Sequence, residues 1–301
     1  MKRILITGSN GLLGQKLSDL YLGIEGVELL ATGTGANRHP LGKALNYQSL
    51  DIRDKQAVLS CFQEFRPHCV IHTAAMTNVD QCELEKEACW ALNVTALEGL
   101  VEAANEVGAH FIHLSTDFIF DGEKGPYKEE DPATPVSYYG ESKLAGEQLV
   151  MEKAKSWAIV RTILVYGIVK DMSRSNIVLW AKGALESGKE INVVTDQFRS
   201  PTLAEDLAMG CRLIEDQEAQ GVYHISGKDF MSVYELVERV ARYWNLSTEH
   251  MHPSTSEGIK QPAKRPPITG FILDKAIRDL GYAPRSFEEG LAVLEKQLLS
   301  E

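Results

Sequence analysis

Short apolar runs alternate with longer stretches of helical periodicity through the first half of the chain. The apolar runs are typical of strands buried on both faces, at 3–7, 28–32, 68–72, 111–115 and 158–161. The periodic stretches predict helices at 11–21, 55–65, 83–107 and 137–155. This alternation predicts a parallel sheet covered on both faces, and therefore an α/β, doubly wound Rossmann fold.

The pattern loosens from about residue 167, where the predicted elements are shorter. We expect helices at 176–187, 203–216, 232–245 and 287–299, strands at 191–195 and 222–225, and a long loop near the substrate at 253–267. Ser232 is the expected N-cap of the helix that it precedes. The predicted domains are a Rossmann domain over 1–166, to which 197–228 returns, and a smaller interleaved C-terminal substrate domain formed by 167–196 and 229–301.

Three glycines follow the first predicted strand with the spacing GxxGxxG, at Gly8, Gly11 and Gly14. A strand, a glycine-rich turn and a helix place backbone N–H groups and a helix N-terminus at one point, where a pyrophosphate is stabilised. Gly8 suits a tight turn, Gly11 lets the backbone approach the phosphates, and Gly14 allows close packing of helix on strand. The pattern predicts a dinucleotide site, and an ordinary glycine-rich turn is the alternative.

The second predicted strand ends without an acidic residue, since none occurs from Leu29 through Gln48. An Asp or Glu there would bind the ribose 2′-hydroxyl of NAD. Thr34 and Arg38 are instead suited to a 2′-phosphate, which favours NADP(H). NAD(H) stays open, because Arg38 is equally compatible with a solvated loop.

Tyr139 and Lys143 are four residues apart on a predicted helix, so their side chains share one face. A nearby ammonium favours the phenolate and lowers the pKa of a phenol from about 10. A hydroxyl of Thr116 or Ser115, at the end of an apolar strand, is placed to fix a carbonyl oxygen beside Tyr139. The pattern predicts hydride transfer to a carbonyl carbon, with Tyr139 protonating the oxygen.

Composition narrows the class of protein and of partner. The 301 residues suffice for one large or two modest domains, and the net charge of −11 argues against nucleic-acid or anionic-membrane partners. No run approaches the ~20 apolar residues of a membrane span, and the first apolar run is too short for a signal peptide. Five cysteines without CxxC spacing indicate reduced thiols in a cytoplasmic protein, and the eight histidines form no HExxH-like cluster, so we predict no metal site.

These segments resemble the extended short-chain dehydrogenase/reductase family over essentially the whole chain, and within it the dTDP-4-dehydrorhamnose reductases. The resemblance rests on 7–14, 50–54, 72–80, 115–122, the Tyr139–Lys143 pair and 196–202. It implies NAD(P)H-dependent reduction of a nucleotide 4-keto-6-deoxy sugar, with hydride delivered to C4. A nucleotide-sugar substrate is the implied partner, and a homodimer is left open.

The resemblance also implies roles for individual residues. The catalytic group is Thr116, Tyr139 and Lys143. The expected cofactor-binding residues are Gly8, Asn10, Gly11, Leu12, Leu13, Gly14, Thr34, Arg38, Asp51, Ile52, Thr73, Ala74, Ala75, Thr77, Asn93, Tyr139 and Lys143. The expected substrate-binding residues are Val79, Asp117, Phe118, Leu164, Gln197 and Arg199. Alternatives remain: Asp51 as a helix cap, 73–75 as small packing residues, and Asn93 as an ordinary polar contact.

The chain departs from the reductase pattern at three places. Phe118 stands where the family usually has Tyr, and Leu164 where it has Trp, so an aromatic sugar contact is lost. Arg199 stands where the family often has Gly, and either pairs with a diphosphate or covers surface. Two other functions therefore stay open: an epimerase or dehydratase with tightly bound NAD, and a non-catalytic protein like the regulatory subunit of methionine adenosyltransferase. Intact Thr116, Tyr139 and Lys143 argue against the non-catalytic role.

Overall fold

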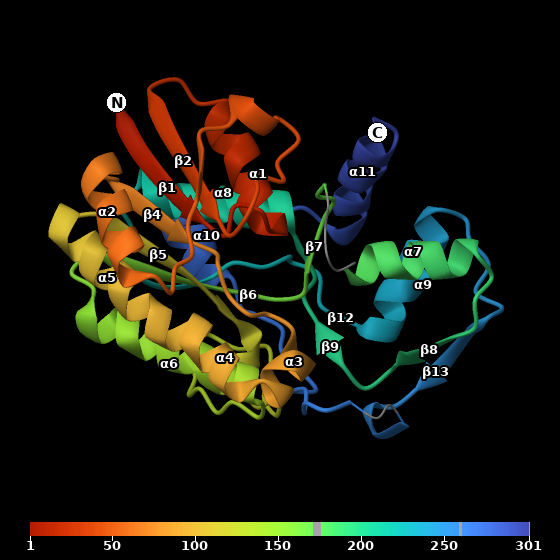
Figure 1. Ribbon diagram of the computed structural model, residues 1–301. Coiled ribbons are helices and arrows are strands. Elements are labelled where there is room, and N and C mark those ends of the chain that lie inside the picture. The colour runs from red at the N-terminus through yellow and green to blue at the C-terminus, as the bar shows by residue number, and fades with distance from the viewer. Residues whose placement is uncertain (171–175, 259–260, 301) are drawn as a thin grey trace.

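A seven-stranded parallel sheet forms the larger part of the molecule, and a smaller part lies beside it (Figure 1). The computed structural model describes residues 1–170, 176–258 and 261–300. The strand order is β11-β6-β5-β4-β1-β2-β3, and every neighbouring pair is parallel. The strands are β1 (Lys2–Thr7), β2 (Val27–Gly33), β3 (Tyr47–Ser49), β4 (Cys69–His72), β5 (His110–Thr116), β6 (Trp157–Thr162) and β11 (Gly221–His224).

Helices cover both faces of this sheet, so the predicted doubly wound fold is confirmed. On one face α1 (Leu12–Leu22), α8 (Ala204–Asp216) and α10 (Asp274–Leu280) share an apolar core with the strands. On the other, α2 (Lys55–Phe65), α5 (Ala96–Val107) and α6 (Tyr138–Lys153) form a second core. Strand side chains alternate between the two cores: Ile4 and Ile6 face one, and Leu5 the other.

The helix predicted at 83–107 is interrupted, and the prediction of one continuous helix is wrong. The chain instead forms α3 (Val79–Leu84), α4 (Lys86–Trp90), a π-helical turn at Ala91–Thr95 and then α5. Glu85 leaves the helical conformation at φ −119° and ψ 57° and separates α3 from α4. Apolar periodicity continues across this break, and so it does not reveal it. The π-helical turn brings Asn93 into the interior, where it is 2% exposed.

The smaller part has its own apolar core, built from α7 (Ile177–Glu186), α9 (Val233–Tyr243), α11 (Phe287–Leu298) and the parallel pair β8 (Ile191–Val194) and β13 (Met251–Ser254). The Ser232 side chain accepts a hydrogen bond from the Glu235 N–H, as its predicted N-cap role requires. The short pairs β7 (Val165–Tyr166) with β10 (Thr202–Leu203), and β9 (Phe198–Arg199) with β12 (Met231–Ser232), lie between the two parts.

The division into two domains stays a prediction, but the packing differs from it in one segment. Residues 271–282, assigned to the substrate domain, contain α10 and pack into the core of the large sheet through Phe271, Leu273, Ala276 and Leu280. In the predicted loop at 253–267, residues 253–254 belong to β13, and 259 and 260 lie outside the described residues.

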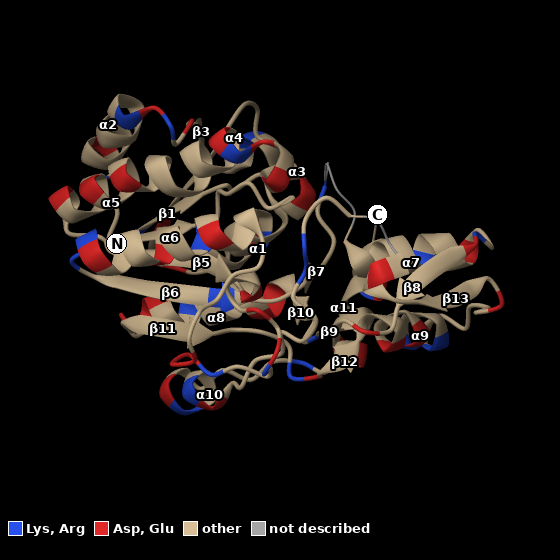
Figure 2. Cartoon of the chain, turned by 90° about the horizontal axis from the view of Figure 1, so that it is seen from below, with Lys and Arg blue, Asp and Glu red and all other residues tan. Residues whose placement is uncertain are grey.

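The surface helices carry charges of both signs. Figure 2 shows acidic and basic positions side by side on α4 and α10. Within the described ranges, no helix is long and apolar enough to cross a bilayer, and no three His, Cys, Asp or Glu residues are grouped to hold a metal ion.

Candidate active site

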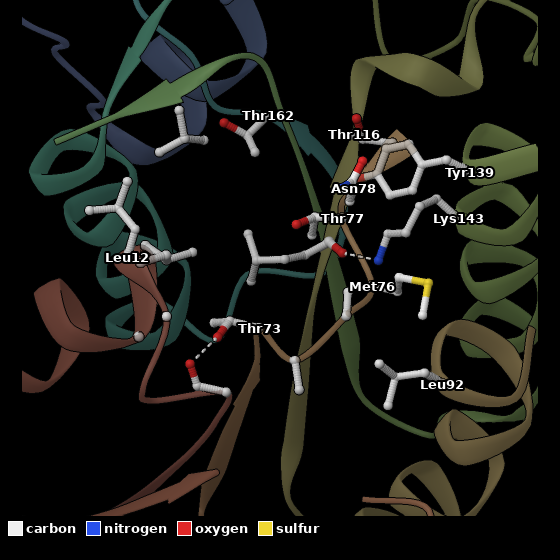
Figure 3. A pocket seen from close by; sticks show the side chains of 18 of the residues that line it. Leu12, Thr73, Met76, Thr77, Asn78, Leu92, Thr116, Tyr139, Lys143 and Thr162 are labelled. Carbon is white, nitrogen blue, oxygen red and sulfur yellow. Dashed lines mark hydrogen bonds between the residues drawn. The ribbon is translucent and has the colours of Figure 1, made fainter. Parts of the chain in front are cut away.

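A cavity of about 930 Å³ opens at the carboxyl ends of the central strands and extends from the start of α1 to α6 (Figure 3). In open parallel sheets, ligands bind at this edge. Most predicted site residues line it together: Gly8, Asn10, Gly11, Leu12, Leu13, Gly14, Thr34, Asp51, Ile52, Thr73, Ala74, Ala75, Thr77, Val79, Thr116, Asp117, Phe118, Tyr139, Lys143, Leu164 and Arg199. Three do not line it: Arg38, Asn93 and Gln197.

The glycine-rich turn leaves no space for side chains where it supports α1. Gly8 has φ 72°, and a Cβ on it would lie 2.7 Å from the Ala74 nitrogen. A Cβ on Gly14 would lie 2.4 Å from the Gly8 carbonyl oxygen, so only glycine allows this approach. Gly11 is the N-cap of α1, and no side chain caps the helix there. The uncapped N–H groups face the cavity, and this arrangement fits the pyrophosphate of a dinucleotide.

Asn10 organises the loop after β2 and does not cap α1. Its Nδ2 donates to the Ala36 carbonyl oxygen at 3.0 Å, and its Oδ1 accepts from the Arg38 N–H at 2.9 Å. Thr34 lines the cavity, but the Arg38 side chain, predicted to bind a 2′-phosphate, does not. Of the two residues that favoured NADP(H) in the sequence, only Thr34 faces the cavity, so the structure gives this coenzyme preference less support than the sequence did.

Asp51 is not the cap of α2, because Asp54 fills that position and accepts from the Ala57 N–H at 3.0 Å. Asp51 instead pairs with Arg53 at 2.7 Å, and this hydrogen-bonded ion pair lowers the pKa of Asp51. Both residues line the cavity beside Ile52. Of the two roles open for Asp51, the structure excludes the helix cap, and the cofactor-binding role stays a prediction.

The loop after β4 is fixed at both ends by side-chain hydrogen bonds. The Thr73 hydroxyl donates to the Thr7 carbonyl oxygen at 2.7 Å. Asn93 accepts from the Met76 N–H at 2.8 Å and donates to the Met76 carbonyl at 3.1 Å and to the Ser142 hydroxyl at 3.0 Å. Asn93 therefore lies behind the cavity and joins this loop to α6, whereas the resemblance implied that it contacts the cofactor.

We predict that Asn93→Ala lowers the free energy of unfolding by about 1–3 kcal/mol, since it leaves buried partners of the amide without hydrogen bonds. Urea unfolding measures the loss. Asn192→Ala, at an exposed position of β8, is the control and should change stability by less than about 0.5 kcal/mol. Equal effects of the two variants would contradict the positioning role of Asn93.

The three catalytic candidates meet at one wall of the cavity. Thr116 ends β5, and Tyr139 and Lys143 lie one turn apart on α6 (Figure 3). Ser137 caps this helix, accepting from the Gly140 N–H at 3.3 Å. A Cβ on Gly140 would lie 2.1 Å from the Phe118 carbonyl oxygen, so glycine lets α6 pack against the segment after Thr116.

The expected effect of Lys143 on the Tyr139 phenol is not found. The Lys143 ammonium donates to the Leu114 carbonyl oxygen at 2.6 Å and lies 3.4 Å from His113 Nε2. Burial lowers the pKa of Lys143 to about 8. The pKa of Tyr139 is raised, chiefly by burial. A sequence pattern places the two residues on one helix face but does not fix where a long lysine side chain points.

A buried ion pair holds α6 against the sheet one turn beyond Lys143. Glu147 accepts from the Arg161 guanidinium at 2.8 and 3.0 Å, and both residues are at most 5% exposed. Arg161 lies on β6, so the pair fixes the register of the helix that carries Tyr139 and Lys143. The negative charge of Glu147 also opposes the burial-induced fall in the pKa of Lys143.

The substrate side contains one cation that the sequence analysis missed. Arg265 lines the cavity and donates to both carboxylate oxygens of Asp80, at 2.8 and 3.1 Å. Arg265 belongs to the 253–267 segment, which was expected near the substrate. Its positive charge in that segment could have identified it from the sequence as a substrate-binding residue. Gln197 instead donates to the Ser256 hydroxyl at 3.0 Å. Arg199 is 4% exposed and donates to backbone carbonyls, so the surface role considered for it is wrong.

The fold and this cavity place the chain in the extended short-chain dehydrogenase/reductase class. The glycine-rich turn, here called the cradle and formed by Gly8, Gly11 and Gly14, and Tyr139 on the cavity wall together suit a nicotinamide cofactor. Residues 1–299 match the family described as the RmlD substrate binding domain, and the chain belongs to that family.

Two curated relatives have different descriptions. Methionine adenosyltransferase 2 subunit beta of Xenopus laevis is 34% identical over 263 residues, which cover 86% of this chain and 77% of that protein. The spore coat polysaccharide biosynthesis protein SpsK of Bacillus subtilis (strain 168) is 33% identical over 299 residues, which cover 97% of this chain and 96% of SpsK.

Two similar solved structures are dTDP-4-dehydrorhamnose reductases. The one from Clostridium acetobutylicum has a TM-score of 0.86 and 31% identity, with 99% of each chain covered. The one from Bacillus anthracis, in complex with NADP, has a TM-score of 0.84 and 30% identity, with 99% of this chain and 100% of that chain covered. Both agree with the resemblance noted from the sequence.

Proposed function

We propose that this protein reduces a nucleotide 4-keto-6-deoxy sugar with NADPH or NADH, as a dTDP-4-dehydrorhamnose reductase does. The observation that carries the proposal is one continuous cavity with the glycine cradle at one end and Thr116, Tyr139 and Lys143 on its wall. Five cysteines, all free thiols, support a cytoplasmic setting.

Each part of the cavity has a role in this reaction. The cradle of Gly8, Gly11 and Gly14 would hold the cofactor pyrophosphate, and the bound cofactor would supply the hydride. Tyr139 keeps its proton at neutral pH because burial raises the pKa of its phenol, which suits a proton donor. Arg265 is partly exposed and lines the cavity, so it is the cation best placed to bind the substrate diphosphate. The diphosphate would then replace Asp80 as the partner of Arg265.

The test is loss of nicotinamide absorbance on addition of a dTDP-4-keto-6-deoxyhexose, run with NADPH and with NADH. Sustained oxidation supports the reductase, and the two rates give the coenzyme preference. Cofactor binding without net oxidation, together with NAD retained through purification, would favour the epimerase or dehydratase instead.

A second candidate is a regulatory subunit that binds a methionine adenosyltransferase. The observation in its favour is the 34% identity to a subunit beta of that enzyme. Leu164, which lines the cavity where the reductases have an aromatic residue, is compatible with this role. Co-purification with a methionine adenosyltransferase catalytic subunit, without turnover of keto sugars, would support this candidate over the reductase.

We predict a fall in kcat for reduction as the pH rises through about 8. Below that pH the buried Lys143 is an ammonium in the wall of the same cavity as Tyr139. Above it the positive charge is lost, and the negative charge that develops on the substrate oxygen during hydride transfer is stabilised less. A pH series of kcat measures this limb, with Lys143→Met as the control in which it should vanish. A wild-type profile flat to pH 10 would contradict the role.

A further inference from the structure

The carboxylate of Asp117 lies at the cavity wall, and both of its oxygens accept hydrogen bonds from within the protein. Asp117 is 2% exposed. Its Oδ1 accepts from the Thr116 hydroxyl at 3.0 Å, and its Oδ2 accepts from the Thr269 hydroxyl at 2.5 Å. Asp117 therefore orients the hydroxyl groups of Thr116 and Thr269, whereas the resemblance had implied that Asp117 contacts the sugar.

The contact with Asp117 fixes the direction of the Thr116 hydroxyl. A threonine has one O–H, and an ionised carboxylate only accepts, so Thr116 gives its hydrogen to Asp117. The Thr116 oxygen accepts in turn from the Phe118 N–H at 3.2 Å. The same hydroxyl acts on the Tyr139 phenol, where it opposes the burial-induced rise in the pKa of Tyr139. The charge on Asp117 therefore determines what Thr116 presents to the proton donor.

Arg199 supplies the positive charge beside Asp117, with Nε 4.0 Å from Oδ2. Its terminal nitrogens donate to the carbonyl oxygens of Phe198, Pro266 and Pro267 at 2.7, 2.7 and 2.9 Å, and to Gln197 Oε1 at 3.4 Å. A guanidinium has five N–H groups; these four contacts occupy the four on the terminal nitrogens, and Nε is turned towards Asp117. Arg199 is therefore not free to bind a diphosphate in this arrangement.

Two of the acceptors of Arg199, the carbonyl oxygens of Pro266 and Pro267, lie in the segment that carries Arg265. Pro266 and Pro267 directly follow Arg265, and the Thr269 N–H donates to the Phe198 carbonyl oxygen at 3.1 Å. Thr269 then returns to Asp117 through its hydroxyl. One buried network thus links the seating of this segment on β9 to the hydroxyl of Thr116.

We propose that Arg199 and Asp117 form a buried positioning pair that couples the seating of residues 265–269 to the orientation of the Thr116 hydroxyl. The inference rests on the proposed function for its kinetic meaning, but the pair itself is testable without turnover. The charged or titratable groups around it are Tyr139 from α6, which faces Asp117, and Arg265 from the loop, which faces Arg199. Without Arg199, a carboxylate would remain buried and unpaired, which is costly.

The kinetic test compares Arg199→Met, Asp117→Asn and the double variant. We expect Arg199→Met to lower kcat at least about tenfold with KM little changed, because it leaves Asp117 unpaired. The double variant should recover most of this loss, since a neutral amide needs no counter-charge. A raised KM with unchanged kcat in Arg199→Met, and no recovery in the double variant, would show a substrate-binding role and overturn the proposal. Arg239→Met, which breaks an ion pair on α9, is the control.

Hydrogen exchange separates failure of this inference from failure of the reductase function, since it needs no substrate. In Arg199→Met the amides of Thr269 and Phe118 should both exchange faster, and both should slow again in the double variant. Faster exchange at Thr269 with unchanged exchange at Phe118 would overturn the coupling. Where Arg199→Met folds poorly, Arg199→Lys provides the same comparison with the charge kept and the backbone contacts reduced.

Discussion

Replacing Tyr139 by phenylalanine is expected to lower kcat by about 10²–10⁴-fold, the usual contribution of a general acid. The change removes only the hydroxyl from a residue that is 8% exposed and packed edge-on against Phe118, with ring centroids 5.7 Å apart. Because the ring stays, the packing of α6 and the glycine cradle are unaffected. Cofactor affinity, measured by quenching of protein fluorescence, should therefore be unchanged, and steady-state kinetics should show the whole loss in turnover.

Tyr138→Phe is the matched control for this experiment. Tyr138 is the preceding residue on α6, but its ring faces Trp90, with centroids 6.1 Å apart, outside the cavity lining. The control should keep wild-type turnover. Near-normal kcat in Tyr139→Phe would show that another group donates the proton, and the assignment of Tyr139 would then be wrong.

The sequence predicted those parts of the molecule that short-range patterns determine. The alternation of apolar runs and helical periods predicted the doubly wound sheet, because each strand and helix carries its own burial pattern. The glycine spacing predicted the position of the turn before α1 correctly. Glycine is required at Gly8 and Gly14 by close contacts with nearby residues of the chain and with the neighbouring loop. Ser232 and its helix followed from local capping chemistry.

Features set by contacts between distant segments were not predictable in the same way. The break at Glu85 and the π-helical turn leave apolar periodicity intact, yet they carry Asn93 to Met76 and Ser142. The short helix α10 has its partners on the large sheet, far back in the sequence. Arg265 and Asp80 meet across 185 residues.

The direction in which a buried charged side chain points was likewise not predictable, because it depends on contacts between distant segments. Lys143 and Arg199 were both identified from sequence, but a residue type does not determine which acceptor a long cationic side chain finds. In the structure, Lys143 reaches the Leu114 carbonyl, and Arg199 reaches the carbonyls of Pro266 and Pro267. Each of these acceptors is a backbone group, positioned only once the sheet or the loop has formed.

Substitutions at two glycines of the cradle should separate its binding role from its folding role. Gly11→Val adds a side chain at the uncapped start of α1, where a Cβ would lie 3.3 Å from the Gly8 carbonyl oxygen and face the cavity. We expect the protein to fold, and its affinity for NADPH to fall at least about tenfold, which corresponds to about 1.4 kcal/mol, because the side chain occupies the approach to the helix N-terminus.

Gly14→Ala is expected to act differently, although it adds a smaller group. Its Cβ would lie 2.4 Å from the Gly8 carbonyl oxygen and 2.5 Å from the Ser9 Cα, both backbone atoms that cannot move aside. The turn must then shift away from α1, at a cost of about 1–3 kcal/mol in the free energy of unfolding. Gly183→Ala, in α7 with nothing within 4 Å of the added Cβ, is the control and should leave stability equal or slightly higher. Urea unfolding and NADPH titration of all three variants decide the matter. Unchanged cofactor affinity in Gly11→Val would show that the dinucleotide does not bind at this turn.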